Sequence, residues 1–180
     1  SSDLLLSGRP LDEANPVLDT NLVFENATAR VSAIQMPLSP QGLAFSIRRH
    51  RDRPWTFPLF IQNKMLNPLA AALMSFIMDG GRTVLFAGTR SSGKTSLLSA
   101  AIVELMRSTR IIIVEDTLEL PISKYQELKY DIQSMKVQSV ITQGESELTA
   151  TDGIRTSLRL GDSALIVGEV RSKEAVALYE

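Results

Sequence analysis

The sequence contains no cysteine and only one histidine among its 180 residues. Disulfide bridges and thiolate metal sites are therefore excluded, and a metal site built on histidines is not expected. Neither positive nor negative charge dominates, because 19 basic residues nearly balance 20 acidic ones. This balance argues against a dominant polybasic surface for nucleic acid, although it leaves room for a local patch.

Long apolar runs are absent too. The longest candidate, Leu69 to Met78, falls short of the ~20 residues that span a bilayer, and we predict that it is a buried helix. The N-terminal residues, Ser1 to Leu6, have neither an initiator Met nor the basic region of a signal peptide, and Ser172 to Glu180 stop inside a helical pattern. We therefore expect a fragment that is cut at both ends.

What the chain does contain is 44% hydrophobic residues, enough for a buried core. Residues 1–51 read as a partial, β-rich α+β domain, because short runs of apolar or alternating residues are separated by turn residues. Residues 52–66, rich in arginine and proline, are predicted to be a linker. The strand candidates are Leu22 to Phe24, Ala29 to Ile34 and Leu43 to Arg48.

Residues 67–180 alternate strands with helices, which predicts an α/β domain with a largely parallel sheet. Asn67 and Pro68 favour a helix start, and Gly80-Gly81 favour its end. Tyr125 to Val140 could form one or two strands, and Gln143 to Thr151 reads as a polar loop. The other expected elements are buried strands at Thr83 to Ala87, Ile111 to Val114 and Ala164 to Val167, and helices at Lys94 to Arg107 and Asp152 to Leu160.

One motif carries most of the chemistry. Residues 88–95, Gly-Thr-Arg-Ser-Ser-Gly-Lys-Thr, match G-x-x-x-x-G-K-[ST] between an expected strand and an expected helix. The glycines let backbone N–H groups point at phosphate oxygens, Lys94 can reach the β/γ-phosphates, and the Thr95 hydroxyl can bind Mg²⁺. We therefore predict an ATP and Mg²⁺ site at Gly88, Thr89, Arg90, Ser91, Ser92, Gly93, Lys94, Thr95 and Ser96.

Acidic residues follow two of the expected strands. Glu115, Asp116 and Glu119 follow Ile111 to Val114, and Glu169 follows Ala164 to Val167. Side chains at the carboxyl ends of parallel strands face the ligand crevice. Glu115, Glu119 or Glu169 could position the attacking water, and the sequence pattern does not distinguish among these three carboxylates. Thr95, Asp116 and Glu169 could hold Mg²⁺, partly through water; solvated acidic turns are the competing interpretation.

Together these features resemble the type II/IV secretion ATPase superfamily, which includes the GspE-type, pilus and archaellum motors. The resemblance rests on the P-loop at 88–95, on an "Asp box" at Ile113 to Leu120, and on Ser157 to Asp162 followed by Ala164 to Arg171. It covers most of residues 20–180, and several details look archaeal. Gly161 stands where the family has proline. The family's His box and C-terminal subdomain would lie beyond residue 180.

The resemblance implies a RecA-like P-loop core working in a homo-hexameric ring, in the cytoplasm at the inner face of the cell membrane. It implies a membrane platform protein as partner, and nucleic acid is not expected. It also implies that arginines of the N-terminal domain approach the phosphates as arginine fingers do. By motif position these are Arg30 and Arg48, with Arg49 as the substitute for Arg48; ordinary surface arginines are the competing interpretation.

The predicted function is therefore an ATP-hydrolysing motor for secretion or for assembly of a pilus-like or archaellum-like filament. This chain alone is expected to bind Mg-ATP and to hydrolyse it weakly or not at all. Two other functions remain open at this point: a RecA-like DNA translocase or helicase, and a non-catalytic nucleotide-dependent scaffold.

Overall fold

The computed structural model describes residues 11–24, 27–51, 53–89, 91–137, 150–161 and 163–170. The chain divides into two compact units, residues 1–52 and residues 53–180. The predicted class is confirmed, because a unit with an antiparallel sheet precedes a unit with a parallel sheet and helices. Among the helices of the described residues, none combines the length and apolar character needed to cross a bilayer.

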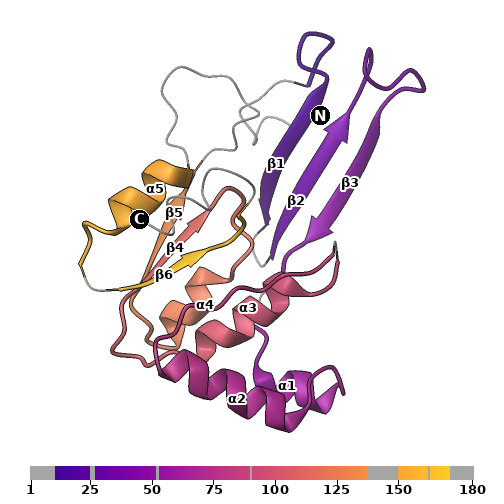
Figure 1. Cartoon of the computed structure of the whole chain (residues 1–180). Helices are drawn as coiled ribbons and strands as arrows, with labels where there is room; N and C mark the ends of the chain where they lie inside the picture. The colour runs from indigo at the N-terminus through magenta and orange to yellow at the C-terminus, as the bar shows by residue number, and fades with distance from the viewer. Residues whose placement is uncertain are drawn as a thin grey trace. The chain divides into compact units, whose positions relative to one another are not determined.

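The first unit is built on three antiparallel strands in the order β1-β2-β3 (Figure 1). They are β1 (Val17–Phe24), β2 (Ala27–Ile34) and β3 (Ala44–Arg49). Alternate residues of a strand face opposite sides of its sheet, so Ala29 and Ala33 share a face with Leu18, which lies opposite Ala33. All three are buried. The three predicted strands therefore exist, and β1 begins five residues earlier than predicted.

The second unit contains a parallel sheet in the order β5-β4-β6, formed by β5 (Ile132–Lys136), β4 (Ile111–Glu115) and β6 (Ala164–Val167). Every residue of the central strand β4 is buried. A continuous apolar run is typical of a parallel strand that is covered on both faces. The unit's helices are α1 (Phe57–Gln62), α2 (Pro68–Asp79), α3 (Lys94–Val103), α4 (Ile122–Glu127) and α5 (Ala150–Ser157).

Helix α3 takes part in two apolar clusters. Its Ile102 packs with Ile111 and Tyr125 in one cluster, and its Ala100 and Ala101 pack with Phe57 and Phe60 of α1 in the other. The segment 52–66, predicted to be a linker, therefore contains a packed helix that belongs to the second unit. Phe57 and Phe60, three residues apart, form the apolar face of this helix. The prediction of a linker rested on the arginines and prolines of the segment and overlooked this spacing.

Helix α2 begins and ends where predicted. The Asn67 side chain accepts a hydrogen bond from the Leu69 N–H at 2.8 Å, Pro68 is the first helical residue, and Gly80 follows the last. The prediction that this helix is buried is wrong, because Leu69 is 79% exposed and Phe76 is 77% exposed. Its contact with the rest of the unit is made by small or flexible residues such as Ala71 instead.

Thr83 to Ala87 do not form the predicted buried strand. None of the described strands pairs with this segment, and Leu85 is 79% exposed. High β-propensity describes residues that fit a paired, half-buried surface, so it cannot by itself supply the neighbouring strand that forms the ladder. The context expected for the P-loop is therefore met on the helix side only.

Three other boundaries differ from the prediction. The segment predicted as one or two strands over 125–140 contains one, β5, but that strand starts only at Ile132, because α4 begins directly after Pro121 and extends to Glu127; residues 138–140 lie outside the described residues. Helix α3 ends at Val103, four residues early, since Glu104 and Leu105 donate to carbonyls three residues back. Helix α5 begins at Ala150, which the sequence placed in a polar loop; residues 143–149 of that loop lie outside the described residues.

Candidate functional site: the P-loop and the carboxyl ends of β4 and β6

The P-loop leads into α3 through a left-handed glycine. Gly93, directly before Lys94, has φ 87°, and no side chain of the described residues caps the helix. Left-handed backbone is readily adopted by glycine and costs other residues about 1 kcal/mol or more. The first N–H groups of an α-helix have no partner within the helix, and the helix dipole adds partial positive charge there. An uncapped start such as this one can accept an anion.

The Lys94 side chain folds back onto the P-loop and places its ammonium group beside the loop backbone. Its Nζ donates to the Thr89 carbonyl at 2.9 Å, and the Ser92 N–H donates to the same carbonyl at 3.3 Å. A Cβ on Gly88 would lie 2.6 Å from Ser92 Oγ, so the loop closes tightly over this glycine. The two fixed glycines of the motif thus have separate roles, one for close approach and one for backbone conformation. Arg90 lies outside the described residues.

Glu115, the last residue of β4, is a buried carboxyl group that is only 4% exposed. Its Oε1 accepts hydrogen bonds from the Glu119 N–H at 3.1 Å and the Leu120 N–H at 3.3 Å. Its Oε2 is buried and has no hydrogen-bond partner among the described residues. Burial raises the pKa of Glu115 to about 7, against the lowering effect of the two backbone N–H donors.

The end of β6 lies directly against this carboxyl group. The Gly168 N–H donates to the Val114 carbonyl at 2.9 Å, which extends the β4–β6 pairing by one residue. A Cβ on Gly168 would lie 2.8 Å from Cγ of Glu115, so any larger residue would displace the glutamate side chain. Glu169, the next residue, is exposed. The structure therefore brings the carboxyl ends of β4 and β6 together, through a strand pairing that the sequence pattern did not specify.

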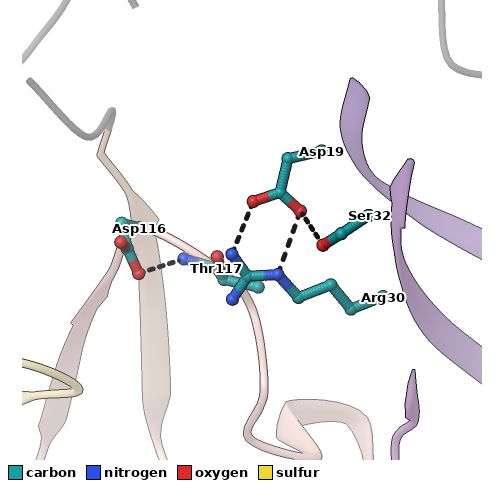
Figure 2. A network of polar contacts seen from close by, with 5 residues as sticks. All are labelled: Asp19, Arg30, Ser32, Asp116 and Thr117. Atoms are coloured by element: carbon teal, nitrogen blue, oxygen red, sulfur yellow. Dashed lines mark hydrogen bonds and ion pairs between the residues drawn. The ribbon is translucent and has the colours of Figure 1, made fainter. Parts of the chain in front are cut away.

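The other acids near Glu115 are less buried. Asp116 accepts a hydrogen bond from the Thr117 N–H at 2.6 Å (Figure 2), and its charge and that of Glu119 both raise the pKa of Glu115. Asp116 and Glu119 are half-buried. Within the ranges described above, no three His, Cys, Asp or Glu side chains gather closely enough to hold a metal ion by themselves. A Mg²⁺ ion here would need oxygens from water or a phosphate as well, which suits an ion that keeps several of its waters.

The two arginines implied by the resemblance are neighbours in the first unit. Arg30 of β2 lies directly opposite Arg48 of β3, so both side chains are on the same face of the sheet, and Arg49 is on the other. Asp19 of β1 accepts two hydrogen bonds from Arg30, at 2.6 and 3.0 Å, and a third from Ser32 at 3.2 Å (Figure 2). The register therefore pairs Arg30 with Arg48 rather than with Arg49, and the role of these arginines toward a phosphate stays a prediction.

Several residues of these clusters were missed by sequence reasoning. Asp19 sits in an unremarkable strand, and only the register reveals that it holds Arg30. Gly168 belongs to the motif Ala164 to Arg171, but its contact with Glu115 depends on the parallel pairing of β4 with β6. Ser99 and Tyr125, which form a buried hydrogen bond at 2.7 Å, carry no sequence signal, since they are 26 residues apart on two helices. Asp162 and Arg171 of the third motif lie outside the described residues.

Comparison with known proteins supports the resemblance. The family model described as type II/IV secretion system protein matches residues 18–179. A putative conjugal transfer protein of Mycobacterium tuberculosis is 30% identical over 97% of this chain and 49% of its own length. An uncharacterized protein of Methanocaldococcus jannaschii is 33% identical over 96% of this chain and 24% of its own length. This chain thus spans about half the length of the first relative, and less of the second.

Among solved structures, the VirB11 ATPase of the Brucella suis type IV secretion system, in complex with sulphate, aligns with 97% of this chain and 56% of its own. The TM-score is 0.45 and the sequence identity is 18%. The family rests instead on the sequence model, which spans nearly all of the chain. This chain belongs to the family of type II/IV secretion system proteins.

Proposed function

We propose that this protein is an ATP-binding and ATP-hydrolysing motor of a type II/IV secretion, pilus or archaellum-like system. The observation that carries the proposal is the uncapped start of α3, with Gly93 in the left-handed conformation and the Lys94 ammonium held over the loop. This is the arrangement that suits a nucleotide's β- and γ-phosphates. Family membership supports the same assignment.

Different residues of this chain would bind the phosphates, hold Mg²⁺ and orient the attacking water. The backbone of residues 88–96 would hold the phosphates, and Thr95 would contribute a hydroxyl to Mg²⁺, with Asp116 and Glu169 acting through water. Bound Mg²⁺ would neutralise charge that develops on the γ-phosphate. Glu119 and Glu169, less buried than Glu115, are the carboxylates that can orient a water. Arg30 and Arg48 would add positive charge as arginine fingers do.

The larger assembly belongs to the proposal as well. A homo-hexameric ring on the cytoplasmic face of the membrane, working on a membrane platform protein, suits a family named for secretion systems. One of the relatives is itself called type IV secretion system protein PtlH, from Bordetella pertussis, and is 30% identical over 54% of this chain.

ATP turnover by the full-length protein tests the proposal. Lys94→Ala should abolish turnover, because backbone N–H groups cannot replace a full charge beside the phosphates. Lys124→Ala is the matched control, since the Lys124 ammonium pairs with Glu127 on the surface of α4 and not with the P-loop. Equal turnover by the wild type and Lys94→Ala would contradict the proposal. Turnover that requires added DNA would favour the DNA translocase instead.

A further inference from the structure

A buried polar contact joins the helix after the P-loop to the segment that follows β4. Tyr125 of α4 is fully buried, and its hydroxyl donates to the Ser99 carbonyl at 3.1 Å. The same hydroxyl lies 2.7 Å from Ser99 Oγ. Because Tyr125 has one hydroxyl proton, the Ser99 hydroxyl donates to the Tyr125 oxygen when that proton goes to the carbonyl. Ser99 is one helical turn beyond Thr95, in the helix that the P-loop begins.

Glu115 holds the other end of the same segment. Its Oε1 binds the N–H groups of Glu119 and Leu120, which closes the turn after β4. The Ile122 N–H then donates to the Leu120 carbonyl at 2.9 Å, so α4 starts as this turn ends. Leu120 and Tyr125 also pack in one apolar cluster. A continuous path of contacts therefore runs from Glu115 through the turn and α4 to Ser99.

The environment of Glu115 does not suit a water-activating base. One carboxylate oxygen, Oε1, is occupied by two backbone donors, and the other, Oε2, is buried and has no hydrogen-bond partner among the described residues. A base must reach the proton that it abstracts, directly or through one water. Glu119, whose N–H is held by Glu115, and Glu169, which follows the glycine packed on Glu115, are both more exposed.

We propose that Glu115 and Tyr125 are positioning residues, which fix the turn carrying Glu119 and join it to α3 through Ser99. This inference rests on the proposed ATPase function, and it separates Glu115 from the carboxylates that face the water. Burial raises the pKa of Tyr125, and the charge of Glu115 adds a smaller effect in the same direction. The titratable groups whose charges act on Glu115 are Glu119 and Asp116.

Two substitutions of Glu115 distinguish positioning from base catalysis. In Glu115→Gln the amide oxygen can still accept from Glu119 and Leu120, so turnover should stay within about three-fold of wild type, whereas Glu115→Ala should lose about ten-fold or more. A general base would lose its function in both variants alike. Turnover is measured on full-length protein, with thermal unfolding to confirm that each variant is folded. A Gln variant as slow as the Ala variant would overturn the positioning role.

Tyr125→Phe tests the helix end of the path without altering the size of the side chain. Turnover should fall about ten-fold while the Kd for an ATP analogue changes by less than about two-fold, because the phosphate-binding loop itself is untouched. Tyr130→Phe is the matched control, because the partly buried Tyr130 hydroxyl also donates to a carbonyl of α3, that of Val103. Among the described contacts, however, the Tyr130 hydroxyl does not reach Ser99. Equal turnover by the two Phe variants would overturn the coupling. Failure of the ATPase proposal itself would instead appear as unchanged turnover in Lys94→Ala.

Discussion

Replacing Glu115 by Gln should make the protein more stable at neutral pH and remove a pH-dependent step. Burial raises the pKa of Glu115 from its ordinary value of 4.5 to about 7. Between pH 4.5 and pH 7, the folded protein therefore keeps the Glu115 proton, whereas the unfolded chain has lost it. Stability must then fall as the pH rises through this window, and stay level below 4.5 and above 7. At about 1.36 kcal/mol for each pKa unit, the loss is about 3 kcal/mol.

Urea denaturation at pH 4 and pH 8 measures this effect as a difference between wild type and variant, which cancels the other titrating groups. The difference should be near zero at pH 4 and should grow to about 3 kcal/mol in favour of Gln at pH 8. Glu127→Gln is the control, because Glu127 is exposed in a surface ion pair with Lys124 that contributes at most about 1 kcal/mol. A difference between Glu115→Gln and wild type that does not change with pH would refute the reasoning.

Two further predictions concern the ends of the sheet. Gly153→Ala should destabilise the protein by about 1–2 kcal/mol in chemical denaturation, because a Cβ would lie 2.8 Å from Val137 Cγ1 and 3.1 Å from Val114 Cγ1. Thr156→Ala, at an exposed position of the same helix, is the control and should change stability by less than about 0.5 kcal/mol. A stabilising effect of Gly153→Ala would contradict this prediction and would show that α5 can move away from the two valines. In the full-length protein, Glu169→Gln should bind ATP normally but turn it over at least ~100-fold more slowly, as expected when a water-orienting carboxylate is lost. Normal turnover in Glu169→Gln together with inactive Glu119→Gln would transfer this role to Glu119.

The sequence predicted those features that local chemistry determines. Asn67 and Pro68 specified a helix start, since a capping oxygen and a fixed φ act within a few residues. The uninterrupted run Ile111 to Val114 specified a strand covered on both faces. Gly93, fixed by the P-loop motif, adopts the left-handed backbone that only glycine accepts readily.

Features that depend on distant partners could not be predicted in the same way. Thr83 to Ala87 have strand-forming residues, but a strand also needs a neighbour, which nothing local supplies. The Tyr125 hydroxyl finds Ser99 only after α3 and α4 pack, and Asp19 meets Arg30 only through the β1–β2 register. Gly161 shows an intermediate case: its φ of 99° is closed to the proline of the family pattern, so the turn itself differs.

Titration of Mg-ATP into the 180-residue chain tests the central claim most directly, because it asks only whether the P-loop binds phosphates. Calorimetry on the wild type should give a saturable isotherm with one site for each chain, and the Lys94→Ala variant should show none under the same conditions. The Lys124→Ala variant should match the wild type, since its ammonium group pairs with Glu127 on the surface. Binding of equal affinity by the wild type and Lys94→Ala would contradict a nucleotide site at this loop.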